Sequence, residues 1–78
     1  MSVNYINIMR EMVKLKILRS LSGRTQRQLA AEASITPAFL SMLESGKRRP
    51  SKEIKKRLSI ALGIPENLLF DQEKENAE

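Results

Sequence analysis

Apolar residues recur at steps of three and four positions over residues 4–21, which is the spacing of one face of an α-helix. Lys and Arg occupy the other positions, and Ser22-Gly23 follows as a break, so the pattern predicts an amphipathic helix. A basic amphipathic helix can lie on a membrane surface, but the wide stripe and the absence of Trp favour packing into a core. The residues expected to face that core are Ile8, Met12, Leu15, Leu18 and Leu21, with Met9, Val13 and Ile17 widening the stripe.

Residues 25–46 predict two short helices separated by a sharp turn. Thr25 is placed to cap the first helix, and Gln28, three residues later, completes a capping-box pattern. The turn falls at Ser34-Ile35, after which Thr36 is a second cap and Pro37 occupies the first helical position. The apolar positions expected to face inward are Leu29, Ala30 and Ala33 in the first helix and Leu40 and Leu43 in the second, which Gly46 should end.

A further helix is expected over residues 51–62, followed by a last short one over residues 66–70. Ser51 is the cap, and Gly63 is placed to end the longer helix with Ile64 in contact beside it. We expect residues 1–70 to form one domain and the acidic segment 71–78 to be disordered. The inward residues should be Ile54, Leu58, Ala61 and Leu62, with Leu68, Leu69 and Phe70 covering the bottom of the core.

The outward face of the helix predicted after Thr36 carries no charge. It consists of small or uncharged side chains, and three cations follow the helix directly, at Lys47, Arg48 and Arg49. A short helix with an unburied, smooth face beside a cluster of positive charge suits the major groove of DNA. The side chains on that face are Ala38, Ser41, Met42 and Ser45.

Charge and composition support a polyanionic partner and argue against an enzyme. Residues 1–65 hold 13 Lys and Arg against 4 acidic residues, a net charge of +9, whereas residues 66–78 have a net charge of −4. A body this basic is attracted to nucleic acid. The 78-residue chain contains no His and no Cys, which removes the commonest general base and thiolate ligands. We therefore expect no catalytic residues, no metal and no cofactor, in a cytoplasmic protein with no membrane segment.

Residues 10–70 resemble the Cro and phage-repressor (XRE-like) family of helix-turn-helix DNA-binding proteins. The resemblance rests on Gln26, Leu29-Ala30, Ser34-Ile35-Thr36, Leu40-Ser41, Leu43-Glu44, Gly46-Lys47 and Pro50-Ser51. It implies an all-α fold, a compact bundle of five helices like the lambda-repressor DNA-binding domain. It also implies a sequence-specific regulator of transcription, a repressor that binds a palindromic operator in double-stranded DNA as a homodimer.

The resemblance also assigns roles to individual residues. Arg19 and Glu44 are expected to form a structural ion pair without contacting DNA. Two positions depart from the family: Arg24 replaces an apolar residue, and Ser34 replaces a Gly at a turn that needs positive φ. Arg24 therefore either leaves a gap over the core or adds a charge facing phosphate. The expected DNA-binding residues are Gln26, Thr36, Lys47 and Arg48 at phosphates and Pro37, Ala38, Ser41 and Met42 at bases. Arg49 is expected to bind DNA beside them, and Phe39 either packs on the domain or touches DNA.

A second function stays open from the sequence. The same fold could serve as an antitoxin-like or coactivator module that binds another protein, and the apolar character of the predicted reading face suits that role. The dependence of DNA affinity on salt separates the two functions, because only phosphate contacts release counterions.

Overall fold

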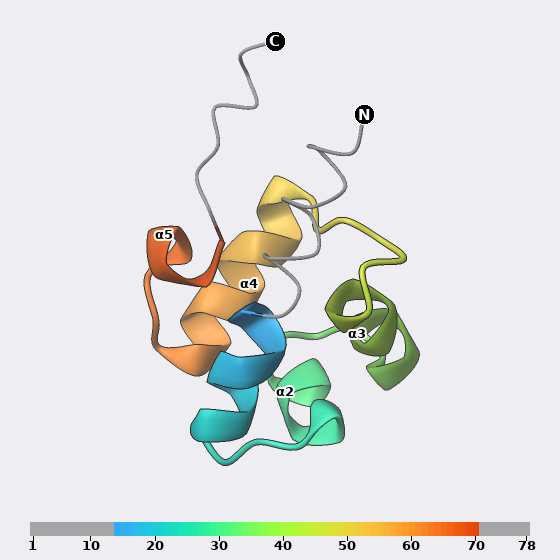
Figure 1. Ribbon diagram of the computed structural model, residues 1–78, viewed down its shortest axis with the longest axis horizontal. Coiled ribbons are helices and arrows are strands. Elements are labelled where there is room, and N and C mark those ends of the chain that lie inside the picture. The colour runs from blue at the N-terminus through green and yellow to red at the C-terminus, as the bar shows by residue number, and fades with distance from the viewer. Residues whose placement is uncertain (1–13, 71–78) are drawn as a thin grey trace, which may run out of the picture.

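The computed structural model describes residues 14–70, which form five helical segments and no strand (Figure 1). The expected all-α bundle is confirmed. The predicted start of the first helix and the acidic segment 71–78 lie outside the described residues. The elements are a helical segment over residues 14–21, α2 (Gln26–Glu32), α3 (Pro37–Glu44), α4 (Lys52–Leu62) and α5 (Glu66–Leu69).

The core lies where the inward faces of all five segments meet. Its members occupy the helical spacings that the sequence showed, so that each segment contributes one or more side chains to the same apolar cluster. Leu18, Ile35, Ile54, Ala61 and Ile64 are half-buried around this cluster. The fully or nearly fully buried residues are Leu15, Leu29, Ala30, Ala33, Leu40, Leu43, Leu58, Leu62, Leu69 and Phe70.

Short capping signals define both ends of α4. The Ser51 hydroxyl accepts a hydrogen bond from the Ile54 amide at 3.2 Å, as the sequence predicted. Gly63 ends the helix in the left-handed conformation, with a φ of 71°. Helix α5 ends at Leu69, and Phe70, which was expected to be helical, is its extended cap residue. The Lys55 ammonium lies 5.5 Å from the centroid of the buried Phe70 ring, which ties α4 to the end of α5.

Three residues predicted to face the core are exposed instead. With 3.6 residues per turn, Ile17 lies about 160° and Leu21 about 120° around the helix from the buried Leu15. The steps of three and four along the sequence therefore overstated the width of the buried stripe. Leu68 is 56% exposed because Leu69, its neighbour in a one-turn helix, takes the inward direction. Leu21 is 78% exposed.

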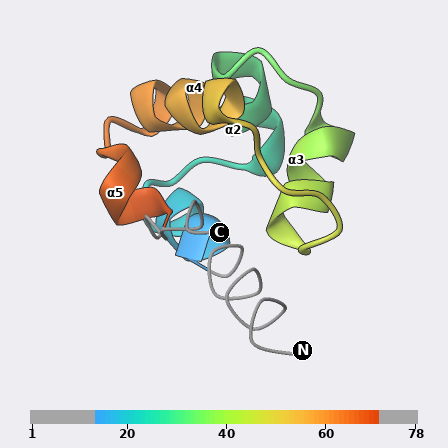
Figure 2. The same cartoon turned by 90° about the horizontal axis from the view of Figure 1, so that it is seen from above.

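Helices α3 and α5 lie on opposite sides of α4. Two views related by a quarter turn agree on this arrangement, with α5 at the left and α3 at the right (Figures 1 and 2). Helix α2 contacts both α3 and α4, and α5 contacts α4. The fold thus presents α3 on one side of the molecule and leaves the surface of α5 available on the other.

Candidate nucleic-acid interface

Helix α2 begins with the capping box that the sequence predicted. The Thr25 hydroxyl accepts a hydrogen bond from the Gln28 amide at 3.0 Å, and the Gln28 side-chain oxygen accepts one from the Thr25 amide at 2.9 Å. These reciprocal bonds satisfy two backbone donors that the helix itself leaves unpaired. The start of α2, and with it the position of Gln26, is therefore defined by local sequence.

The turn between α2 and α3 passes through Ser34, the one residue other than glycine with positive φ in the described chain, at 59°. Glycine adopts this conformation most readily, and a side chain there costs about 1–2 kcal/mol. The Ile35 amide donates to the Ala30 carbonyl at 2.9 Å, which closes the turn. The Arg57 guanidinium also approaches the Ser34 carbonyl, at 3.4 Å, so that α4 supports the turn from outside.

Helix α3 is held by its inner residues and presents a neutral outer face. The Thr36 hydroxyl accepts a hydrogen bond from the Phe39 amide at 3.0 Å, and Pro37 occupies the first helical position. Leu40 and Leu43 are fully buried, and the one charged residue of the helix, Glu44, is buried too. The exposed side chains of α3 therefore carry no charge, and they are Pro37, Ala38 and Ser41, with Ser45 following as the cap.

Three cations lie in the loop that follows α3, and backbone hydrogen bonds hold the start of this loop against the helix. The amides of Lys47 and Arg48 donate to the Met42 carbonyl at 2.9 and 3.3 Å, and Gly46 permits the turn with a φ of 83°. Lys47, Arg48 and Arg49 are all exposed, and none of them pairs with a carboxylate in the part of the chain that the structure describes. We call Lys47, Arg48 and Arg49 the basic loop. Its charge is available to an anionic partner.

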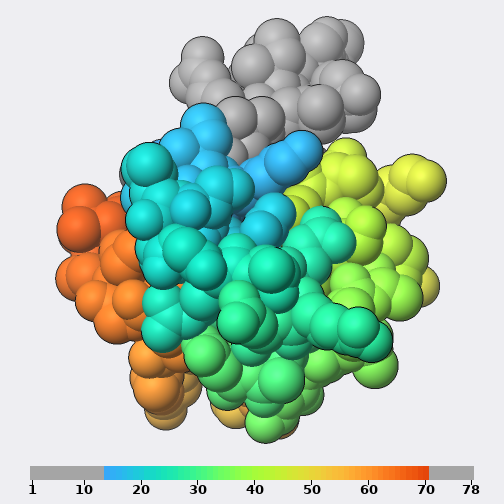
Figure 3. Space-filling model, turned by 90° about the horizontal axis from the view of Figure 1, so that it is seen from below, coloured from blue at the N-terminus to red at the C-terminus, as the bar shows by residue number. Residues whose placement is uncertain are grey.

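Helix α3 and the basic loop lie on the same face of the molecule as α2 (Figure 3). Figure 3 shows α2, α3 and the loop after α3 as one continuous surface, without an intervening element. A groove-reading helix needs positive charge along its flanks, because the phosphates border the groove on both sides. The basic loop supplies such charge beside the end of the neutral face of α3.

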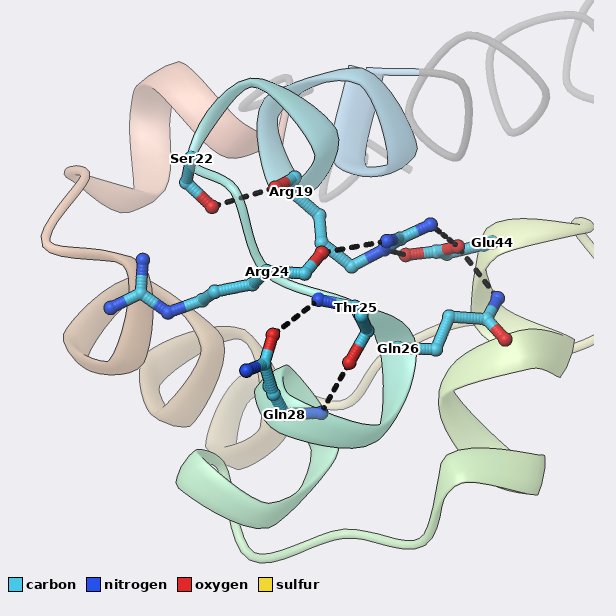
Figure 4. Close-up of polar contacts among 7 residues, drawn as sticks. All are labelled: Arg19, Ser22, Arg24, Thr25, Gln26, Gln28 and Glu44. Carbon is cyan, nitrogen blue, oxygen red and sulfur yellow. Dashed lines mark hydrogen bonds and ion pairs between the residues drawn. The ribbon is translucent and has the colours of Figure 1, made fainter.

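Glu44 lies at the centre of a polar cluster that joins three elements (Figure 4). Its carboxylate accepts from Arg19 Nε at 2.6 Å and Nη2 at 3.1 Å, and from Gln26 Nε2 at 2.9 Å. A further nitrogen of Arg19, Nη1, donates to the Arg24 carbonyl at 2.8 Å. The side chains of Glu44 and Arg19 are only 3% and 11% exposed. The ion pair that the resemblance implied is present, and Gln26 donates one further hydrogen bond to its carboxylate.

The structure places most of the expected DNA-binding residues together at the surface formed by α3 and the basic loop. Met42 is half-buried, and Phe39 packs against the core, which was one of the two positions considered for it. Gln26 is half-buried and engaged with Glu44. Contact with DNA remains a prediction for each of these residues. Those exposed are Thr36, Pro37, Ala38, Ser41, Lys47, Arg48 and Arg49.

Other basic residues have roles that the sequence did not show. Arg24 pairs with a carboxylate: its Nε donates to Glu32 at 2.5 Å, and its side chain extends away from Glu44 (Figure 4). Arg57 pairs with Glu53 at 3.2 Å. Arg27, by contrast, is exposed and makes no ion pair within residues 14–70. Its position next to Gln26 makes it a candidate phosphate contact that sequence reasoning missed.

The described residues contain no group of three or more His, Cys, Asp and Glu that could hold a metal ion. Within the same residues, the helices are too short and too polar for any of them to cross a membrane.

The fold and this surface define a helix-turn-helix DNA-binding protein. The chain belongs to the helix-turn-helix family of Cro and phage-repressor type, whose family model matches residues 15–69. It is 35% identical over 57 residues to the uncharacterized HTH-type transcriptional regulator YqaF of Bacillus subtilis. The aligned part covers 73% of this chain and 75% of that protein. The protein is a DNA-binding transcriptional regulator.

The chain also resembles solved structures of regulatory proteins. The restriction-modification controller protein C.AhdI from Aeromonas hydrophila superposes with a TM-score of 0.82 at 27% identity, covering 85% of this chain and all of that one. The clp gene regulator ClgR from C. glutamicum gives a TM-score of 0.71 at 32% identity, covering 76% of this chain and 78% of that one.

Proposed function

We propose that this regulator is a repressor that binds a palindromic operator as a homodimer, in the cytoplasm and without catalytic activity of its own. The observation that carries the proposal is the neutral, exposed face of α3 directly beside the unpaired basic loop. Double-stranded DNA is the partner that fits both features, because its groove accepts a helix and its phosphates attract the cations.

Phosphate contacts fix the position of the protein on DNA in this proposal, and α3 selects the sequence. The phosphate contacts are Gln26, Thr36 and the three cations of the basic loop, joined by Arg27. The bases meet Pro37, Ala38, Ser41 and Met42. Apolar groups there suit thymine methyls, and the Ser41 hydroxyl is the hydrogen-bonding group among them, so DNA shape should contribute to the choice of site.

Two exposed apolar side chains support a homodimer. Ile60 of α4 is 72% exposed and Leu68 of α5 is 56% exposed, on helices that contact each other. Helix α5 is on the side of α4 away from α3, so a second copy bound there leaves both reading helices free (Figures 1 and 2). A single module of this kind buries only about 600–1,000 Å² on DNA, and a dimer doubles that area.

A protein-interaction role, as in an antitoxin-like or coactivator module, is the second candidate. Ile60 and Leu68 support it, because exposed apolar side chains suit a different protein partner as well as a second copy. The two roles differ in the salt dependence of DNA affinity. A DNA-binding protein with several phosphate contacts loses affinity steeply between low and moderate salt, whereas a protein-interaction module shows weak binding with little dependence.

Selection of bound sequences from random duplex DNA tests the proposed function. We expect enrichment of a palindrome whose half-sites lie about one helical turn apart. The same selection with Ser41→Ala should change the ranking of sites, by about 1–3 kcal/mol of discrimination for a lost base contact. No enriched sequence, or an unchanged ranking, would contradict the assignment of α3 as the reading helix.

Sedimentation of the free protein tests the dimer surface. Leu68→Asp should weaken self-association, because it places a charge in the proposed apolar contact. Ser41→Asp is the matched control, since α3 lies on the opposite side of α4 and its substitution should leave self-association unchanged. Equal effects of the two variants would argue against this surface.

A further inference from the structure

The hydrogen bond from Gln26 to Glu44 settles how the Gln26 side chain is oriented. An ionised carboxylate only accepts hydrogen bonds, so the amide nitrogen, and not the amide oxygen, must face Glu44. The distance from Nε2 to Oε1 of Glu44 is 2.9 Å, and Figure 4 shows the Gln26 oxygen on the far side of the amide from Glu44. One N–H is therefore taken, and the second N–H remains as the donor of this side chain for a ligand.

The environment of Glu44 makes this orientation rigid. The carboxylate is itself held by two nitrogens of Arg19, at 2.6 and 3.1 Å, and it is almost completely buried. The main chain at Gln26 is fixed by the capping box of Thr25 and Gln28. Both ends of the Gln26 side chain are thus anchored before any partner binds, although a free glutamine on a surface samples many rotamers.

The charge of Glu44 does not oppose an approaching phosphate. Arg19 neutralises the carboxylate through two hydrogen bonds, so the pair presents no net charge at this point of the surface. Gln26 can therefore take its orientation from a carboxylate without bringing an unpaired negative charge to the DNA backbone.

We propose that Glu44 is a positioning residue for DNA binding: it orients the amide of Gln26 so that its second N–H donates to a backbone phosphate. This inference rests on the proposed phosphate contact of Gln26. Without Glu44 the Gln26 amide can turn over and present its oxygen, which repels a phosphate oxygen. Ordering the Gln26 side chain on binding then also costs rotamer entropy. The ion pair of Arg19 and Glu44 thereby serves DNA recognition as well as stability.

A double-mutant cycle on DNA affinity tests the proposal. The probe is a duplex of about 20 base pairs, which is long enough for one protein. Its sequence is random, because phosphate contacts do not need an operator. Gln26→Ala should lower affinity by roughly tenfold, the scale of a hydrogen bond to a charged group. Glu44→Gln leaves the Arg19 charge unpaired, which should raise affinity alike with and without Gln26. The loss of affinity on Gln26→Ala should therefore be smaller in the Glu44→Gln background than in the wild-type background. The two substitutions are then coupled in binding.

Salt dependence separates the neutral donor Gln26 from the cations of the basic loop. Gln26 is neutral, so Gln26→Ala should lower affinity equally at every salt concentration and leave the salt slope unchanged. Lys47→Ala is the matched comparison and should reduce the slope by about 1. Affinities are compared at temperatures where melting curves show each variant to be folded.

Nuclear magnetic resonance of the wild-type chain tests the orientation of the Gln26 amide even if Glu44→Gln fails to fold. One of the two Gln26 Nε2 protons should be protected from exchange by Glu44 without DNA, and the other should shift when the duplex is added. Gln28 is the internal control, since its amide oxygen is bound to the Thr25 amide and its nitrogen has no carboxylate partner in the described chain.

Two results would overturn the proposal. One is an equal loss of affinity on Gln26→Ala in the wild-type background and in the Glu44→Gln background, because the two residues would then act independently. The other is a pair of Gln26 side-chain protons that DNA leaves unchanged. A wild-type chain that binds no duplex would instead overturn the phosphate contact itself.

Discussion

Removing one partner of the Arg19–Glu44 pair should cost this domain much of its stability. Both side chains are nearly buried, at 11% and 3% exposure, and Glu44 accepts three hydrogen bonds. The loss of one member of a buried ion pair costs about 3–5 kcal/mol, because the other charge stays behind without its partner. The total stability of so small a domain is about 5 kcal/mol, so either substitution brings it close to unfolding.

The two single substitutions should differ in size. Glu44→Ala leaves Arg19 with the Arg24 carbonyl as an acceptor, and the long Arg19 side chain can swing towards water. Arg19→Ala leaves the short Glu44 side chain buried, with Gln26 as its remaining donor. We therefore expect a loss of about 3 kcal/mol for Glu44→Ala and of about 5 kcal/mol for Arg19→Ala.

Thermal unfolding followed by circular dichroism measures these losses. A loss of about 3 kcal/mol should lower Tm by more than about 12 °C, at about 4–8 °C for each kcal/mol in a domain of this size. Arg24→Ala is the control, because it removes the outer Arg24–Glu32 pair, which is 30% and 45% exposed, and keeps the Arg24 carbonyl. It should change stability by about 1 kcal/mol or less.

The double variant Arg19→Met with Glu44→Leu gives the sharpest test of this reasoning. It removes both charges and fills the space with apolar side chains, so it should melt closer to the wild type than either single alanine variant does. Single variants that melt like the wild type would refute a buried pair. A double variant whose loss is the sum of the two single losses would refute the interaction between the charges.

Three other changes test separate parts of the structure. Lys47→Ala and Arg48→Ala should each weaken binding to all duplex sequences alike and flatten the salt slope by about 1, and a changed ranking of sites would contradict a phosphate role. Ser34→Gly should relieve the strain at positive φ and stabilise the domain by up to about 1 kcal/mol in urea unfolding; lower stability would show that the serine is favoured there. Removal of residues 71–78 takes away a net charge of −3, so DNA affinity at low salt should rise and the gain should fade as salt increases, with Tm nearly unchanged. A truncated chain that melts earlier would show that this segment packs on the domain.

Local signals made the helices and their ends predictable. Thr25, Thr36 and Ser51 cap α2, α3 and α4 through their own hydroxyls, and each bond joins residues only three positions apart. Gly63 takes the left-handed conformation that the end of α4 requires. Such interactions depend on a few neighbouring residues, so the sequence alone determined them, together with the neutral face of α3 and the charges after it.

Tertiary packing decided which side of each helix is buried and which polar groups meet. The exposure of Ile17, Leu21 and Leu68 depends on where the neighbouring helices lie, and spacing along one helix does not contain that information. Gln26 reaches Glu44 across 18 positions in the chain. A bond across that separation depends on how α2 and α3 pack against each other. The partner of Gln26, and its consequence for DNA recognition, therefore followed from the fold and not from the sequence pattern.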